Sequence, residues 1–208
     1  MDKLRYQMVL HQLSERGIKD KKILEVMEHV PRHLFVDKEF HSSAYEDGPL
    51  PIGYNQTISQ PYIVGYMTEQ LHVLPHHTVL EIGTGCGYQT AILSQLAKKV
   101  FSLERIPELA ESAQNRLQEL GYTNVDVINA NGWNGYKKEA PYDRIIVTAG
   151  AKKIPEPLID QLTNGGIMVI PVGKLLFSQT LRIISKDSDG NVIKKTSLPV
   201  RFVRLINK

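Results

Sequence analysis

The chain has 208 residues, of which 42% are hydrophobic and 23% charged, and we expect residues 1–208 to form a single globular domain. Its formal net charge is only +3, and lysine and arginine are spread along the chain without a basic block. Charge therefore gives no reason to expect nucleic acid as a partner.

The first 45 residues predict a helical extension packed on the main domain. They lack the apolar core of a signal peptide, and no apolar run of the chain reaches membrane-spanning length, which predicts a cytoplasmic protein without membrane contact. A first helix, stopped by Gly17, should bury one face made of Leu4, Met8 and Leu13. A second, capped by Asp20 and ended by Pro31, should bury Ile23, Leu24, Met27 and Val30.

Residues 46–61 are dense in residues that prevent regular structure, and they predict an ordered loop. Gln56, Thr57 and Ser59 give this loop short hydrogen-bonding side chains suited to a carboxylate or an amide. Ser59 has a structural alternative, because apolar spacing predicts a helix from about Ser59 to Leu71 that this serine could cap. From the residues alone, both interpretations of Ser59 stay open.

Metal-binding and nucleophilic side chains form no catalytic cluster in the sequence. His76 and His77 lie in a turn that we expect to be exposed, and no third metal ligand stands near them. Cys86 is the only cysteine, which excludes an internal disulfide. It fits a small residue in a glycine turn better than a nucleophile. We therefore expect no metal site.

The most informative segment, residues 81–87, joins a predicted buried strand at 78–80 to a predicted helix at 89–97. Glycines at 83, 85 and 87 leave the main chain bare, so a ligand can lie against it where N–H groups attract anions. A tight turn that needs glycine for geometry alone is the alternative. A strand at 99–103 then delivers Glu104, where a doubly wound fold places the acid that binds ribose hydroxyls. This order favours a nucleotide-like ligand.

The residue after the third glycine separates two classes of cofactor. A dinucleotide fingerprint requires glycine or alanine at the position of Tyr88. The glycines, preceded by Glu81, instead resemble the first motif of S-adenosylmethionine-dependent methyltransferases. That resemblance implies S-adenosyl-L-methionine as the cofactor, with its methionine carboxylate near the helix N-terminus and its ribose on Glu104.

The remaining elements continue the alternation of helix and strand. We expect helices at 107–120 and 155–162, strands at 125–128, 144–148 and 167–170, and a final antiparallel hairpin from 179–185 and 192–197. The predicted class is α/β: a doubly wound, Rossmann-like methyltransferase fold with a mostly parallel sheet, antiparallel C-terminal strands and the N-terminal helical extension.

Several segments outside the glycine turn carry a more specific signal. They are Gln56-Thr57-Ile58-Ser59-Gln60-Pro61 and residues 47–53, 143–149, 165–166, 169–173 and 200–203. Together with residues 79–85 they resemble the protein-L-isoaspartate O-methyltransferase family, and the resemblance covers nearly the whole chain. It implies methyl transfer from S-adenosylmethionine to the free α-carboxylate of L-isoaspartyl residues in damaged proteins and peptides. The resulting ester cyclises to a succinimide, which can reopen to normal aspartate.

The resemblance and the glycine turn together assign residues to roles. Thr57 and Ser59 are the expected catalytic residues. The expected substrate contacts come from Gln56, Thr57, Ser59, Arg201 and Phe202. The expected cofactor contacts come from Gly83, Thr84, Gly85, Cys86, Glu104, Arg105, Asn131 and Gly132.

Two positions depart from the family pattern. Ala130-Asn131-Gly132 stands where the family usually has Gly-Asp-Gly, so an amide replaces the acid that accepts from the adenine amino group. Asn131 can still accept through its carbonyl oxygen. Arg204 stands where the family tends to have proline, next to the substrate-facing segment at the C-terminus.

A carboxylate with an ordinary pKa of about 4 is already ionised at neutral pH, so the implied reaction needs alignment and no general base. Two alternatives remain: a methyltransferase of the same fold acting on a small molecule or nucleic acid, and a non-catalytic binding module. Thr148-Ala149-Gly150-Ala151 lacks the Asn/Asp-Pro-Pro-Tyr/Phe signature of enzymes that methylate nucleic-acid amines. No long apolar seam is present, which predicts a monomer.

Overall fold

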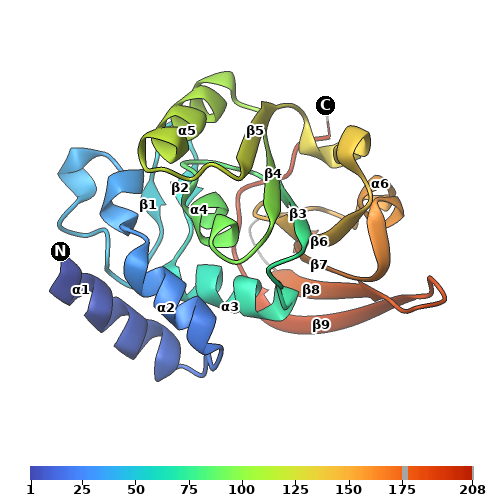
Figure 1. Cartoon of the computed structure of the whole chain (residues 1–208), viewed down its shortest axis with the longest axis horizontal. Helices are drawn as coiled ribbons and strands as arrows, with labels where there is room; N and C mark the ends of the chain where they lie inside the picture. Colours follow the sequence, from blue (N-terminus) through green and yellow to red (C-terminus); the bar gives the residue numbers. More distant parts are fainter. Residues whose placement is uncertain (175–177, 208) are drawn as a thin grey trace.

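Short runs rich in valine, isoleucine and leucine form a seven-stranded sheet in the computed structural model, which describes residues 1–174 and 178–207 (Figure 1). The strand order is β5-β4-β3-β6-β7-β8-β9. The first five strands in this order are parallel, and β8 and β9 are antiparallel, which confirms the predicted fold class. The strands are β3 (Thr78–Ile82), β4 (Lys99–Glu104), β5 (Val125–Asn129), β6 (Tyr142–Val147), β7 (Leu162–Lys174), β8 (Ser178–Lys186) and β9 (Val192–Val200).

Alternating side chains of the strands fill two separate cores, one on each face of the sheet. Val79, Val100 and Ile146 belong to the core shared with α2 (Lys21–His29), α3 (Pro61–Leu71) and α4 (Tyr88–Ser94). Leu80 and Ile145 belong to the opposite core, which α6 (Glu156–Asp160) helps to close. Helix α5 (Pro107–Glu119) packs against β4 and β5. Both faces are therefore covered, as a doubly wound sheet requires (Figure 1).

The N-terminal extension is helical, but its first apolar residue is wrongly predicted. Helix α1 (Asp2–Gln7) continues as a π-helix at Met8–Ser14, where Met8 and Leu13 are buried. Leu4 is 42% exposed, because nine residues of α-helix would place it on the face opposite Leu13, whereas the wider π-helical turn aligns Met8 with Leu13. The second helix, α2, begins as expected, since the Asp20 carboxylate accepts hydrogen bonds from two main-chain N–H groups of its first turn.

The segment predicted as a loop contains a small hairpin of β1 (Leu50–Pro51) and β2 (Thr57–Ile58). Its turn places Tyr54 and Asn55 in the left-handed region, and the Gln56 N–H donates to the Gly53 carbonyl over 2.8 Å. Left-handed angles at both central residues match the twist of a tight hairpin. Strands of two residues are too short for an alternating pattern, so the sequence shows a loop where the structure has a hairpin.

Two smaller expectations are also corrected. The helix expected at 155–162 ends at Asp160, and Leu162 already belongs to β7. His77 is only 5% exposed, because its Nδ1 atom accepts the Leu74 N–H over 2.9 Å and folds the imidazole into the turn. Within the described residues, no group of three or more histidine, cysteine or acidic side chains could hold a metal ion, and no helix has the length and apolarity to cross a membrane.

Candidate active site

The glycine turn lies at the carboxyl ends of β3, β4 and β6, where the chain order of the sheet reverses. Open α/β sheets bind ligands in the crevice at such a switch point. Gly83 has a φ of +98°, and a Cβ atom there would lie 2.4 Å from the Thr148 hydroxyl oxygen. That hydroxyl donates to the Gly83 carbonyl over 2.6 Å. Only glycine therefore fits at position 83, and it leaves the main chain bare.

Glu104 holds the same turn from the end of β4. Its side chain is buried, and one carboxylate oxygen accepts the Gly85 N–H over 2.9 Å while the other accepts the Ile106 N–H over 3.0 Å. Each oxygen keeps a further lone pair. The carboxylate can thus fix the turn and still accept hydrogen bonds from the paired hydroxyls of a ribose, which is the arrangement that an adenosine-containing cofactor requires.

Glu81 lies beneath the turn on β3 and is fully buried. Ser102 and Thr90 donate to its Oε2 atom over 2.6 and 2.5 Å, and its Oε1 atom has no partner among the described residues. Burial is the main cause that raises the pKa of Glu81 to about 7; the two hydrogen bonds oppose the rise, and the Glu104 charge adds to it. The folded protein therefore binds a proton here that the unfolded chain, with its ordinary pKa of 4.5, releases.

This proton makes stability fall as pH rises. The stability that the protonated Glu81 carboxyl contributes is fully present below the pKa of Glu81 in the unfolded chain. It is lost as pH rises through the pKa of Glu81 in the folded protein, so the free energy of unfolding falls progressively between pH 5 and pH 8. Glu81→Gln cannot titrate, and its free energy of unfolding should gain about 3 kcal/mol relative to the unaltered protein over this interval. Urea denaturation at several pH values measures the difference, with exposed Glu108→Gln as the control. If the free energy of unfolding of Glu81→Gln changed with pH in the same way as that of the unaltered protein, the raised pKa of Glu81 would be contradicted.

Three adjoining hollows open at this edge of the sheet. The inner hollow contains Gly83, Gly85, Glu104, Arg105, Asn131 and Gly132. The middle hollow contains Gly83, Thr84, Gly85, Cys86, Ser59 and Phe202. The outer groove, about 740 Å³ in volume, contains Pro49, Ser59, Gln60, Arg201 and Phe202. Thr57 and Thr148 border all three, so they stand where the hollows meet.

Nearly all residues expected at the site therefore come together around these hollows, and one takes an unexpected place. Gln56 borders the inner hollow and not the outer groove, and its amide donates to the Tyr54 carbonyl over 3.1 Å. Thr148 was not expected from the sequence. Its signal is its place directly after the buried strand β6, beside β3, because side chains at neighbouring strand ends share one crevice.

The structure excludes one of the two interpretations of Ser59. Helix α3 begins at Pro61 with Gln60 at the N-cap position, and no side chain caps it. The capping interpretation is therefore wrong. Ser59 instead borders both the middle hollow and the outer groove, half-buried between them. A ligand contact of Ser59 therefore stays a prediction that this position allows.

The structure shows the surroundings of two further residues predicted to contact the cofactor, Asn131 and Cys86. The Asn131 carbonyl oxygen accepts the Trp133 N–H over 2.9 Å, so the amide already supports the turn that borders the inner hollow. Burial raises the pKa of the Cys86 thiol, which keeps it protonated at neutral pH. Cys86 therefore acts as a small wall of the middle hollow and is a poor nucleophile.

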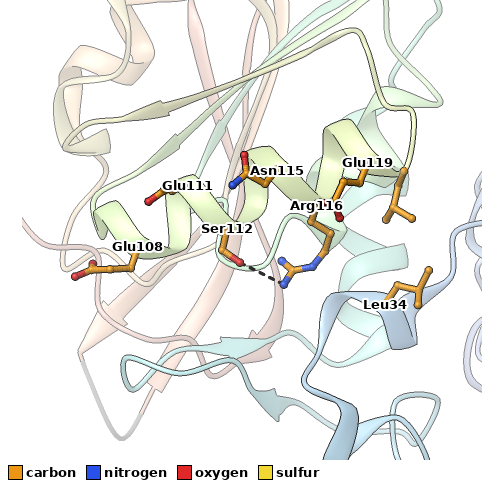
Figure 2. A pocket seen from close by; sticks show the side chains of 8 residues that line it. Leu34, Glu108, Glu111, Ser112, Asn115, Arg116 and Glu119 are labelled. Atoms are coloured by element: carbon orange, nitrogen blue, oxygen red, sulfur yellow. Dashed lines mark hydrogen bonds between the residues drawn. The ribbon is translucent and has the colours of Figure 1, made fainter.

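A separate hollow of about 580 Å³ lies along the outer face of α5 (Figure 2). Glu108, Glu111 and Glu119 point outward there, and Ser112 accepts a hydrogen bond from Arg116 over 3.3 Å. It shares no residue with the three hollows around the glycine turn. The carboxylates along α5 are exposed, and in the described part of the chain no set of hydrogen-bond donors points into this hollow from several sides. It therefore offers a cofactor less than the hollows at the glycine turn do.

Comparisons with known proteins agree with this geometry. The model of the family described as Protein-L-isoaspartate(D-aspartate) O-methyltransferase matches residues 4–208. Protein-L-isoaspartate O-methyltransferase 1 of Syntrophobacter fumaroxidans is 53% identical over 207 residues, covering 99% of this chain and 95% of that protein. Protein-L-isoaspartate O-methyltransferase of Geobacter metallireducens is 49% identical and covers 100% and 95%. A crystal structure described as a putative protein-L-isoaspartate O-methyltransferase from Plasmodium falciparum, in complex with S-adenosyl-L-homocysteine, is 25% identical in sequence. Its TM-score is 0.85, over 98% of this chain and 99% of that one.

Proposed function

Because this chain belongs to the protein-L-isoaspartate O-methyltransferase family, we propose that its three hollows divide one reaction between cofactor and substrate. The enzyme methylates isoaspartyl residues, a step of protein repair, and uses S-adenosylmethionine. When bound, S-adenosylmethionine supplies an electrophilic methyl carbon on a positively charged sulfur. Glu104, Asn131 and Gly132 would hold its adenosine part, and the bare main chain at Gly83 and Gly85 would hold its methionine part.

The outer groove is the proposed site for the isoaspartyl chain. The observation that carries this proposal is that Thr57 and Ser59 border both the groove and the middle hollow. A carboxylate bound by their hydroxyls would lie between the peptide in the groove and the glycine turn. Arg201 is exposed at the groove and adds a positive charge that attracts an anionic residue.

Neutral hydroxyls suit this carboxylate better than a charged clamp. The attacking oxygen is already ionised, so the residues must align it and exclude water without lowering its nucleophilicity. Charge-assisted hydrogen bonds from an arginine would stabilise the carboxylate more strongly in the ground state than at the transition state. Thr57 and Ser59 donate weaker hydrogen bonds, which orient the oxygen and leave it reactive.

Asn131 should be a suboptimal contact for the adenine amino group. Its carbonyl oxygen already accepts the Trp133 N–H, so a second acceptor would have to share that atom. Asn131→Asp supplies two acceptor oxygens, and we expect the Kd for S-adenosylhomocysteine to fall by about 3- to 10-fold, as one hydrogen bond to a charged group contributes about 1 kcal/mol or more. Calorimetric titration measures this, with exposed Asn134→Asp as the matched control. Equal or weaker binding by the Asn131 variant would remove Asn131 from the adenine contact.

One assay tests the proposed substrate directly. The protein is incubated with tritiated S-adenosylmethionine and paired peptides that differ only in L-isoaspartate or L-aspartate at one position. Base-labile label on the isoaspartyl peptide alone is expected. Label on neither peptide would refute the proposal and would favour a methyltransferase of this fold that acts on a small molecule.

We also propose that residues 1–208 act as one domain, as a monomer and in the cytoplasm. Contacts of α2 with both α3 and α4 support the single domain, because they join the N-terminal extension to the core. The unpaired, buried Cys86 is compatible with a reducing compartment. Light scattering after gel filtration, one calorimetric transition and cell fractionation test the three statements. A dimer mass, two separate transitions or a membrane fraction would overturn the corresponding one.

A further inference from the structure

A buried glutamine on β8 holds the segment that separates the middle hollow from the outer groove. Gln179 is 5% exposed, and its side-chain amide uses both of its ends on one residue. The Oε1 atom accepts the Phe202 N–H over 2.7 Å, and the Nε2 atom donates to the Phe202 carbonyl over 3.1 Å. One side chain thereby replaces the pair of hydrogen bonds that a neighbouring strand would provide.

A second attachment holds the same segment from Gly150, three residues after the end of β6. The Gly150 N–H donates to the Val203 carbonyl over 2.7 Å, and the Gly150 carbonyl accepts the Leu205 N–H over 2.9 Å. A Cβ atom at Gly150 would lie 2.3 Å from the Gln179 amide nitrogen, so the two attachments are packed against each other. The Arg204 N–H takes no part in these bonds, so a residue without an N–H, such as proline, could also stand at this position.

The residues fixed in this way form a shared wall. Phe202 borders the middle hollow and the outer groove, and Val203 borders the inner hollow and the outer groove. Displacement of Phe202 would change both the middle hollow and the outer groove. The Gln179 side chain borders none of the three hollows, so it acts on a ligand only through Phe202.

We propose that Gln179 is a positioning residue that keeps Phe202 in the conformation that binds the isoaspartyl chain. This proposal rests on the assignment of the outer groove to the substrate. If only a fraction of the molecules hold Phe202 in the conformation that binds the peptide, the apparent affinity for the peptide falls by the same fraction. Loss of both hydrogen bonds from a buried site is expected to raise the peptide KM by about 10-fold, the equivalent of roughly one to two ordinary hydrogen bonds.

The experiment compares Gln179→Leu with a matched control elsewhere in the fold. Gln161 is likewise buried and uses both ends of its amide on the main chain, at the Tyr136 N–H and the Asn134 carbonyl. Gln161→Leu should cost similar stability, because it loses the same kind of contacts. Only Gln179→Leu should raise the peptide KM by about 10-fold, with kcat and the S-adenosylmethionine KM each changed by less than about 3-fold.

Trypsin gives a second readout that does not depend on methyl transfer. Arg201 and Arg204 are exposed on either side of Phe202, and trypsin cleaves after arginine in segments that detach from the fold. Cleavage at these two sites should rise by about 10-fold in Gln179→Leu and stay unchanged in Gln161→Leu. The tryptic comparison remains informative even if the isoaspartyl assay fails. It therefore separates failure of the proposed role of Gln179 in holding Phe202 from failure of the proposed function.

The variant Gln179→Glu keeps the proposal testable if the leucine variant does not fold. It retains an acceptor for the Phe202 N–H but places a second acceptor oxygen against the Phe202 carbonyl, so it should show the same pattern, a raised peptide KM and increased tryptic cleavage. The proposal is overturned if the folded Gln179 variants match Gln161→Leu both in the peptide KM and in tryptic cleavage at Arg201 and Arg204.

Discussion

Replacement of Ser59 by alanine is expected to lower kcat for an isoaspartyl peptide by about 100-fold, because small misplacements of reacting groups cost that much. Ser59 borders both the outer groove and the middle hollow, where the proposed mechanism aligns the carboxylate. The dissociation constant for S-adenosylhomocysteine should change by less than about 3-fold, since one lost hydroxyl contact to a wall is a small term in binding. Steady-state kinetics and calorimetric titration separate the two effects.

Stability distinguishes this role from a structural one. Since Gln60, and not Ser59, stands at the N-cap of α3, the free energy of unfolding of Ser59→Ala should stay within about 0.5 kcal/mol of the unaltered protein. Ser42→Ala, at an exposed serine outside the three hollows, is the control and should leave both activity and stability unchanged. Near-normal turnover of Ser59→Ala would remove this serine from the reaction.

Replacement of Glu104 by alanine should have the opposite signature, a loss of cofactor affinity of about 100-fold, because two hydrogen bonds from ribose hydroxyls to a charged acceptor are lost. The same change removes the acceptor for the N–H groups of Gly85 and Ile106, so the free energy of unfolding should also fall by about 2 kcal/mol. Calorimetric titration with S-adenosylhomocysteine measures the affinity, and urea denaturation measures the stability.

Glu108→Ala provides the matched control, because this carboxylate lies nearby on the exposed first turn of α5. It should change neither quantity appreciably. Should Glu104→Ala bind the cofactor product with unaltered affinity while losing stability, Glu104 would be a support of the glycine turn and not a contact of the ribose.

The strands and the glycine turn at the carboxyl edge of the sheet could be predicted because their signals are local in sequence. Buried parallel strands appear as apolar runs, and the glycine turn followed by Glu104 is contained in fewer than 30 residues of chain. The hairpin at β1 and β2 escaped prediction since two-residue strands carry no periodicity. The alignment of Met8 with Leu13 depends on a π-helical turn, for which the sequence shows no signal.

The substrate side was only partly predictable, because its geometry depends on contacts between distant residues. The Thr148 hydroxyl meets Gly83 across 65 positions, and Gln179 meets Phe202 across 23 positions. A threonine or a glutamine in the sequence does not predict such a contact, because both residue types are common at protein surfaces. The ambiguity of Ser59, between a helix cap and a ligand contact, likewise required the observed start of α3.

The three hollows draw their walls from different stretches of chain, and this division has a consequence for evolution and engineering. The groove is built mainly from residues 49–63, up to the first turn of α3, and from residues 199–203 at the end of β9, whereas the turn and acid proposed to hold the cofactor lie between β3 and the end of β4. Acceptor preference can therefore drift while the methyl-donor machinery stays under separate selection. A library randomised at Pro49, Gln60, Pro199 and Val200, which border only the outer groove, would sample new acceptors on an intact donor site.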